Sequence, residues 1–186
     1  MTLSVVLTTF NEEKFLSACL TTVRGLADEI IVVDGTSSDE TVDVAKRYRA
    51  KVLIVPNNPE NFHINKKKAI DLATKDWILQ LDADELVSND LISEIRSVIN
   101  LKNEVNGYWI PRKNYFLGRF LLKGGAYPDY TLRLYRRGKG NLPAKNVHEQ
   151  AVVEGKIGYM KSDLLHYSNR KFSDYIQKRF FLYSLI

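Results

Sequence analysis

Short apolar runs and amphipathic segments alternate through the first hundred residues of the chain. The apolar runs, which are typical of buried strands, lie at residues 3–7, 29–34, 51–55 and 77–81. Apolar residues recur at helical spacing over residues 15–23, 41–48, 65–73 and 90–99. This alternation predicts an α/β fold in which a mostly parallel sheet is covered by helices on both faces.

The pattern changes after Asn106. Strand-like segments at residues 108–111, 130–135 and 150–153 are separated by basic and glycine-rich turns. Residues 172–186 are expected to be helical, and they end on apolar residues without a stop signal. We therefore expect one domain with two portions, residues 1–106 and 107–186. We also expect that the natural chain continues, or that its last helix packs on a second copy in a homodimer or on a membrane.

Charge is divided unevenly between these portions. Residues 1–106 hold 12 basic and 17 acidic residues, a balance of −5, and residues 107–186 hold 15 and 5, a balance of +10. The first portion therefore suits a metal site, and the second suits phosphates or an anionic surface. Cys19 is the single cysteine, which fits a reducing compartment. Because no apolar run approaches the roughly 18 residues that span a bilayer, we expect a cytoplasmic protein, either soluble or bound at the inner face of the cell membrane.

Polar clusters follow three of the predicted strands, at residues 9–13, 34–39 and 82–85. In parallel sheets, ligands bind beyond the carboxyl ends of the strands, where these clusters would meet. Asp82 and Asp84 point to the same side if the backbone stays extended, and paired carboxylates suit Mg²⁺ or Mn²⁺. The alternative for Asp82 and Asp84 alone is a turn that caps the next helix.

Three motifs resemble those of the inverting family 2 nucleotide-sugar glycosyltransferases with the GT-A fold. They are Ser4-Val-Val-Leu-Thr-Thr-Phe-Asn-Glu-Glu13, Ile31-Val-Val-Asp-Gly-Thr-Ser-Ser-Asp-Glu-Thr41 and Leu81-Asp-Ala-Asp-Glu85. Residues 129–136, 146–149 and 165–168 are similar to the lipopolysaccharide-core β-glucosyltransferase branch. The resemblance implies a Rossmann-like sheet flanked by helices, with residues 1–106 binding the nucleotide-sugar donor. Residues 107–186 would form a mixed acceptor portion with a C-terminal helix.

The resemblance also implies a nucleotide site. The residues assigned to it are Thr9, Phe10, Asn11, Glu12, Asp34, Asp39, Lys67, Asp82 and Ala83. Asp39 either contacts the nucleotide or only caps a helix. Lys67 and Lys68 stand where the family often has a Gln/Arg-Asn pair, and a run of like charges is usually a solvated helix face.

Metal and catalytic roles follow from the same resemblance. Asp84 is the preferred metal ligand, with Asp82 beside it, and His148 and His166 bind the metal or the diphosphate. A lone histidine is more often structural than a ligand. An inverting transfer needs a base that deprotonates the acceptor hydroxyl, and a carboxylate in the second portion suits this role. Glu149 is the first choice for the base and Asp129 the second.

These expectations describe a metal-dependent transferase that moves a hexose from a UDP-sugar to a glycan or glycolipid acceptor, such as a lipooligosaccharide core. The alternative is a basic module that binds membranes or nucleic acid without catalysis. Acidic motifs at three strand ends speak against nucleic acid. A dinucleotide oxidoreductase is excluded because its Gly-x-Gly-x-x-Gly turn is missing.

Overall fold

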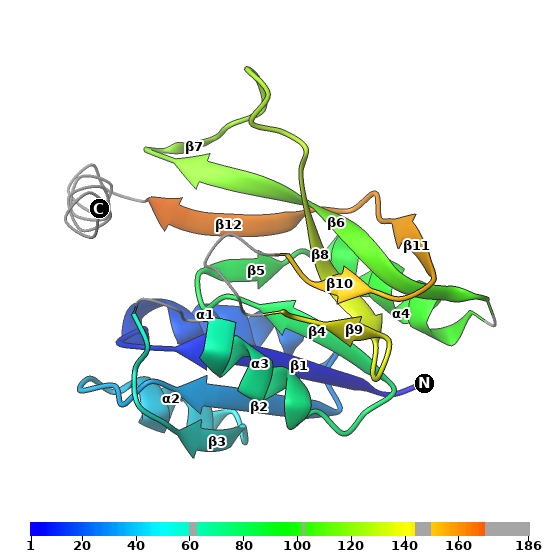
Figure 1. Ribbon diagram of the computed structural model, residues 1–186. Coiled ribbons are helices and arrows are strands. Elements are labelled where there is room, and N and C mark those ends of the chain that lie inside the picture. The colour runs from blue at the N-terminus through cyan, green and yellow to red at the C-terminus, as the bar shows by residue number, and fades with distance from the viewer. Residues whose placement is uncertain (60–62, 102, 144–149, 170–186) are drawn as a thin grey trace.

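The computed structural model describes residues 1–59, 63–101, 103–143 and 150–169. Its centre is a ten-stranded sheet in the order β3-β2-β1-β4-β8-β6-β12-β5, with β7 and β11 also paired to β6 (Figure 1). The strands of this sheet are β1 (Leu3–Thr9), β2 (Glu29–Asp34), β3 (Lys51–Ile54), β4 (Trp77–Leu81), β5 (Glu85–Val87), β6 (Val105–Phe116), β7 (Arg119–Phe120), β8 (Asp129–Arg136), β11 (Lys156–Tyr159) and β12 (Leu164–Asn169). β9 (Gly140–Asn141) and β10 (Val152–Val153) form a separate pair.

Strands β3, β2, β1 and β4 are parallel, as the sequence pattern predicts. Thr9 is opposite Asp34, and Leu7 is opposite Leu81, so the loops after β1, β2 and β4 leave the same edge of the sheet. β1, β2 and β4 are buried because other elements pack on both faces of the sheet, whereas β3 at its edge is largely exposed. The three polar clusters of the sequence therefore lie side by side.

Two hydrophobic clusters hold the layers together. The helices are α1 (Glu13–Val23), α2 (Thr41–Arg47), α3 (His63–Asp71) and α4 (Asn89–Asn100). Buried residues of α1, α2 and α4 pack on the face of the sheet to which Val5 points. On the other face, Val6 belongs to a cluster with residues of α3, with Leu142 after β9 and with Val153 of β10. The alternation of strand side chains thus gives each face its own core.

The sheet continues without a break into the second portion of the chain. β8 is antiparallel to β4, and β6 is antiparallel to β8. β12 lies parallel to β6 and antiparallel to β5. As a result, the short strand that follows Asp84 is held beside β12, and the second portion reaches the edge where the three loops meet.

The outcome differs from the sequence prediction in several places. Strands β5, β11 and β12 were not predicted, because they are short or lack a clear alternation. The strand expected at residues 150–153 is only β10, Val152–Val153. The helix expected over residues 172–186 lies outside the described residues.

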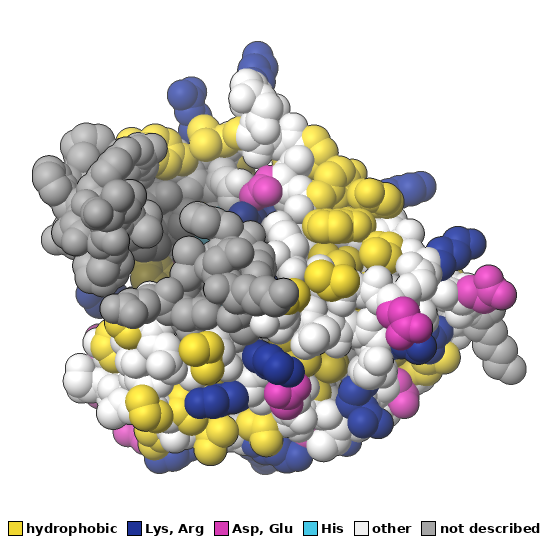
Figure 2. Space-filling model, viewed as in Figure 1, with side chains coloured by type: hydrophobic (Ala, Val, Ile, Leu, Met, Phe, Trp, Pro, Cys, Tyr) yellow, Lys and Arg dark blue, Asp and Glu magenta, His cyan; other side chains and the backbone are white. Residues whose placement is uncertain are grey.

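The surface carries dispersed charge rather than a single basic face in the view of Figure 2, where Lys and Arg side chains also project from the segment around β7. In the described part of the chain, no helix is both long enough and apolar enough to cross a bilayer.

Candidate functional site

The loop after β2 is organised by the buried carboxylate of Asp34. Its Oδ2 accepts hydrogen bonds from Thr9 Oγ1 at 2.8 Å and from Ser37 Oγ at 2.6 Å. Its Oδ1 accepts the backbone N–H of Ser37 at 2.7 Å. Asp34 has no exposed surface. Asp34 and Thr9 thus lie together at the strand ends, where they shape the loop that follows.

Asn11 and Asp39 join the loops after β1 and β2. Asn11 adopts a left-handed backbone, with φ of 55°, and its Oδ1 accepts the N–H of Ser38 at 2.8 Å. Asp39 accepts the N–H groups of Thr41 at 3.0 Å and Glu13 at 3.2 Å. Burial raises the pKa of Asp39, but hydrogen bonds from Thr41 and Glu13 outweigh it and lower the pKa. Asp39 therefore stabilises the first turns of both helices as an ionised carboxylate.

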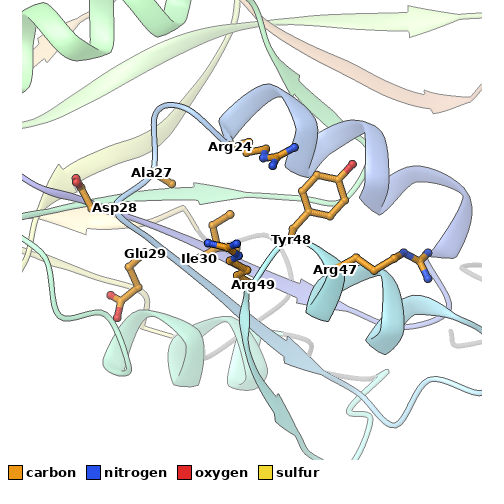
Figure 3. A pocket seen from close by; sticks show the side chains of 8 residues that line it. All are labelled: Arg24, Ala27, Asp28, Glu29, Ile30, Arg47, Tyr48 and Arg49. Carbon is orange, nitrogen blue, oxygen red and sulfur yellow. The ribbon is translucent and has the colours of Figure 1, made fainter.

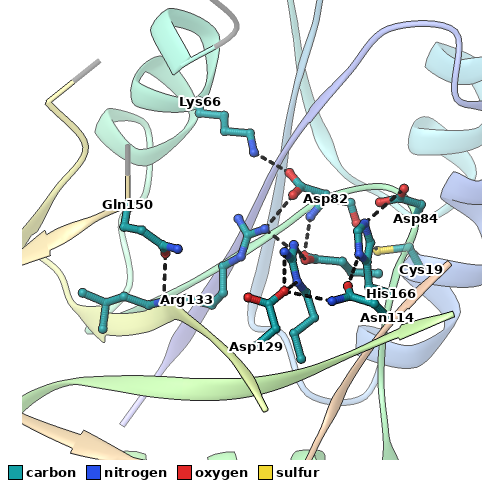
Figure 4. Close-up of polar contacts among 12 residues, drawn as sticks. Cys19, Lys66, Asp82, Asp84, Asn114, Asp129, Arg133, Gln150 and His166 are labelled. Carbon is teal, nitrogen blue, oxygen red and sulfur yellow. Dashed lines mark hydrogen bonds and ion pairs between the residues drawn. The ribbon is translucent and has the colours of Figure 1, made fainter. Parts of the chain in front are cut away.

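A cluster of alternating charges fills the edge of the sheet after β4 (Figure 4). We call it the charged cluster; its members are Lys66, Asp82, Glu85, Arg112, Asp129 and Arg133. The three cations and three carboxylates balance in formal charge. Buried charges need such a balance, since removing an unpaired charge from water costs several kilocalories per mole.

Asp82 is the centre of this cluster on the donor side. Lys66 Nζ donates to its Oδ1 at 2.5 Å, and Arg133 donates to its Oδ2 at 2.6 Å. Its backbone N–H donates to Glu85 Oε2 at 2.9 Å. Burial raises the pKa of Asp82, but the charges of Arg133 and Lys66 hold it well below the usual value. Asp82 is therefore an ionised carboxylate with both oxygens in ion pairs.

Arg133 links the two sides of the charged cluster. It leaves β8 between apolar neighbours, and it contacts Asp82 and also Glu85 Oε1 at 3.0 Å. Burial lowers the pKa of its guanidinium, but Asp82 and Glu85 outweigh this and raise it. Its Nε is buried and has no hydrogen-bond partner among the described residues.

Asp129 lies on the acceptor side of the charged cluster. Its Oδ2 accepts from Arg112 Nε at 3.0 Å, Arg112 Nη2 at 2.7 Å and Asn114 Nδ2 at 3.0 Å. Burial raises the pKa of Asp129, but the hydrogen bonds from Asn114 and Arg112 outweigh it and lower the pKa. A carboxylate stabilised in its ionised form is a weak proton acceptor.

Asn114 connects Asp129 to His166 and orients the His166 ring. Because Asn114 Nδ2 donates to Asp129, its Oδ1 faces His166 Nδ1, 2.7 Å away. The Nδ1 of His166 must then carry the proton, and in the neutral ring Nε2 is left with its lone pair. That Nε2 lies 3.5 Å from Asp84 Oδ2.

The pair Asp84 and His166 fits a divalent metal ion. Two ligand atoms that share one ion at about 2.1 Å each lie roughly 3 to 3.5 Å apart. A carboxylate oxygen and an imidazole lone pair at this distance repel each other unless a proton or a cation joins them. Among the described residues, no group of three His, Cys, Asp or Glu side chains could hold a metal. The pair would therefore need further ligands, which phosphate oxygens and water commonly supply.

The structure brings together most of the residues predicted from the sequence. Asp82, Asp84, Asp129 and His166 converge, and Ala83 is buried between the two aspartates. Thr9, Asn11, Glu12, Asp34 and Asp39 lie at the neighbouring strand ends, where Phe10 is 45% exposed. His148 and Glu149 lie outside the described residues.

Two of the predicted positions make contacts that the sequence did not suggest. The structure directs Lys67 away from the site, because its Nζ pairs with Asp71 one helical turn further along α3. Lys66 is the lysine that contacts Asp82, since successive helix residues point in different directions. Asp82, expected beside Asp84 at the metal, has each of its carboxylate oxygens in an ion pair, one with Lys66 and one with Arg133.

Sequence reasoning did not foresee the ion pairs of this edge. It gave Lys66, Arg112 and Asn114 no role, and it placed Glu85 in a polar cluster and Arg133 near the acceptor side without naming a partner for either. One signal was available, since Arg133 stands between Leu132 and Leu134 in an otherwise apolar strand. A charged side chain in such a run is expected to meet a buried partner of opposite charge. Lys66 and Asn114 carried no comparable signal.

Comparison with known proteins gives a consistent result. Residues 4–162 match the family model Glycosyl transferase family 2. The lipopolysaccharide core biosynthesis glycosyltransferase LpsC of Rhizobium meliloti is 28% identical over 170 residues, covering 89% of this chain and 63% of the relative. An uncharacterized glycosyltransferase of Rickettsia typhi is 28% identical over 188 residues, covering 95% of this chain and 63% of the relative. The chain thus spans less than two thirds of these relatives.

The structure resembles that of Staphylococcus aureus TarS 1-349 solved in complex with UDP-GlcNAc. The TM-score is 0.71 at 17% sequence identity, and the match covers 94% of this chain and 61% of that chain. At this level of identity the similarity concerns the fold, and the fold expected from the sequence is confirmed.

Proposed function

The chain belongs to glycosyl transferase family 2, and we propose that it moves a hexose from a UDP-sugar to a glycan or glycolipid acceptor with inversion at the anomeric carbon. The observation that carries this proposal is the pair Asp84 and His166, 3.5 Å apart at the carboxyl edge of a parallel sheet. The named activity of LpsC and the UDP-GlcNAc bound to TarS support the same class of donor and acceptor.

The donor would bind across the loops after β1, β2 and β4. Asn11, Asp34 and Asp39 hold the first two loops in one shape, so a nucleoside meets a preorganised surface. Lys66 and Arg133 place two cations beside Asp82, where they attract a diphosphate. Their ion pairs with Asp82 fix both side chains before the donor arrives.

Asp84 and His166 would hold Mg²⁺ or Mn²⁺, which neutralises charge on the departing nucleoside diphosphate. Asn114 fixes the ring of His166 so that Nε2, rather than Nδ1, faces Asp84. A hydrogen bond of this kind both orients a ligating histidine and raises its basicity.

The base that deprotonates the acceptor hydroxyl would be Glu149. Asp129, the other carboxylate considered from the sequence, accepts three hydrogen bonds on one oxygen and has a lowered pKa. It therefore suits a positioning role, in which it orients Asn114. The reaction would take place in the cytoplasm, at the inner face of the cell membrane when the acceptor is a glycolipid.

Calorimetric titration tests this proposal. UDP, UDP-glucose, UDP-GlcNAc and GDP-mannose would each be titrated with and without Mn²⁺. We expect Mn²⁺-dependent binding of UDP compounds that is lost in Asp84→Ala. Asp90→Ala, which removes an exposed carboxylate from the first turn of α4, should bind like the wild type. If Mn²⁺ does not change the binding of any UDP compound, the proposal is wrong.

The alternative, a basic binding module without catalysis, predicts a different outcome. Such a protein would bind anionic vesicles in a salt-dependent way and would not respond to UDP with Mn²⁺. The pair Asp84 and His166 favours the transferase, because a carboxylate and an imidazole that could share a metal ion are not needed to bind an anionic surface.

A further inference from the structure

A cleft with three arginines lies at the end of the sheet opposite the charged cluster. It is about 390 Å³ in volume and is lined by the end of α1, the end of α2 and the start of β2 (Figure 3). The lining residues are Arg24, Ala27, Asp28, Glu29, Ile30, Arg47, Tyr48 and Arg49. Strands β1 and β2 begin at this end, whereas the loops of the transfer site follow their last residues.

Three arginines supply the positive charge of this cleft. No hydrogen bond or ion pair within the described part of the chain engages the guanidinium of Arg24, Arg47 or Arg49. Two of them act on Tyr48: hydrogen bonds from Ser17 and Thr21 lower the pKa of its hydroxyl against the effect of burial, and the charges of Arg24 and Arg47 lower it further. Arg24 and Arg47 therefore act together on the Tyr48 hydroxyl, and Arg49 lines the same cleft.

The acidic residues of the cleft do not cancel this charge. Glu29 is turned inward, where its carboxylate accepts from Ser4 at 2.6 Å and from Lys51 at 2.6 Å. Asp28 is exposed and accepts the N–H of Leu3 at 2.8 Å through one oxygen. Among the described residues that line the cleft, three arginines therefore stand against one exposed carboxylate, that of Asp28.

A position at the carboxyl end of a helix accounts for the positive charge of Arg24 and Arg47, but not for that of Arg49. Arg24 and Arg47 lie at the carboxyl ends of α1 and α2, where a cation is favourable without any ligand. Arg49 follows the cap of α2 with a left-handed backbone, φ of 59°, a position that glycine usually takes. The N–H groups of Arg49 and Ala50 close the end of the helix on Lys46 and Ala45, so the loop imposes this conformation. This helix end does not require a guanidinium at position 49, where glycine would take the same backbone conformation without strain.

We infer that this cleft binds the phosphate group of a small sugar phosphate. Guanidinium forks match phosphate oxygens in geometry and charge. Ala27, Ile30 and the ring of Tyr48 offer apolar contact for a sugar face, and the exposed carboxylate of Asp28 accepts hydroxyl hydrogen bonds. A neighbouring hollow of about 220 Å³ shares Asp28, Glu29, Ile30 and Arg49, and it extends the cleft toward Lys51 and Lys75. This site is separate from the proposed donor site.

Arg49→Gly gives a sharp test, because glycine keeps the left-handed backbone and removes the guanidinium. Glucose 1-phosphate would be titrated into the full chain saturated with UDP and Mn²⁺, with glucose and inorganic phosphate as comparisons. We expect glucose 1-phosphate to bind more tightly than inorganic phosphate and glucose to show no binding. In Arg49→Gly its binding should weaken at least tenfold, while thermal stability stays equal or rises. Arg119→Gln, on the exposed strand β7, should bind as the wild type does.

Several results would overturn the inference. Equal binding in Arg49→Gly and the wild type would place the ligand elsewhere. Binding of glucose 1-phosphate to the chain without UDP that disappears once UDP and Mn²⁺ saturate it would assign that binding to the donor site. Tighter binding of phosphatidylglycerol vesicles, lost in Arg49→Gly, would assign the cleft to a lipid headgroup instead of a soluble ligand.

Discussion

Asn114 Oδ1 and His166 Nδ1 lie 2.7 Å apart, on strands β6 and β12, and this contact fixes which ring nitrogen of His166 carries the proton. Arg112 and Asp129 hold the amide of Asn114 from the other side. The imidazole that faces Asp84 is therefore oriented by Asn114, whose amide donates to Asp129, and Asp129 is in turn paired with Arg112.

We expect Asn114→Ala to weaken Mn²⁺ binding by about 10- to 100-fold, because His166 loses the acceptor that selects its tautomer. Calorimetry with Mn²⁺ and UDP measures this directly. Nitrogen chemical shifts of His166 should show a mixture of tautomers in the variant and one tautomer in the wild type. A variant with unchanged Mn²⁺ affinity and an unchanged tautomer would contradict the positioning role of Asn114.

Lys66 and Lys67 form a matched pair of substitutions. Lys66→Met leaves a part-buried carboxylate with one cation fewer, and we expect it to lower the free energy of unfolding by about 2 to 4 kcal/mol. Lys67→Met breaks an exposed pair one turn apart on α3, and we expect a change of at most about 0.5 kcal/mol. Urea unfolding of both variants checks the difference. Equal losses would mean that the ion pair of Lys66 and Asp82 is not important for stability.

Substitutions of Asp129 and Glu149 distinguish a positioning carboxylate from a general base. Glu149→Gln is expected to lower the transfer rate by about 100- to 10,000-fold with UDP binding intact, as for the loss of a general base. Asp129→Asn is expected to weaken Mn²⁺ binding, because Asn114 loses the acceptor that orients it. Single-turnover rates and Mn²⁺ titrations of both variants check this. If Asp129→Asn lowered the transfer rate without weakening Mn²⁺ binding, and Glu149→Gln did not, the two assignments would be exchanged.

Glu29 makes stability depend on pH. Burial raises its pKa, but hydrogen bonds from Lys51, Ser4 and Thr74 lower it from 4.5 to about 2. Because the folded pKa lies below the unfolded one, this stabilisation is present above pH 4.5 and is lost as the pH falls toward 2. We expect it to amount to about 3 kcal/mol at most, since one shifted pKa unit is about 1.4 kcal/mol.

Unfolding in urea between pH 7 and pH 3 tests the role of Glu29. Glu29→Gln should be less stable at neutral pH, and its stability should fall less steeply below pH 4.5 than that of the wild type. If the free energy of unfolding fell equally with pH in the two proteins, Glu29 would not contribute to the loss of stability in acid.

The local pattern predicted the parallel half of the fold correctly. Runs such as residues 29–34 and 77–81 are long enough and apolar enough to be recognised as buried strands. The short strands β5 and β12 could not be predicted in the same way, because β12 depends on pairing with β6 and β5. Their pairing brings Glu85 opposite His166, which are distant in the sequence.

The sequence by itself determined that polar side chains would follow three parallel strands, since the carboxyl ends of such strands share one edge. Only the tertiary structure decided which of them meet. On α3 a shift of one residue turns a side chain by about 100°, which separates Lys66 from Lys67. Asn114 contacts His166 across 52 residues because β6 and β12 are neighbours in the sheet. Contacts of this kind depend on strand pairing, and strand pairing is set by the whole core rather than by any local pattern.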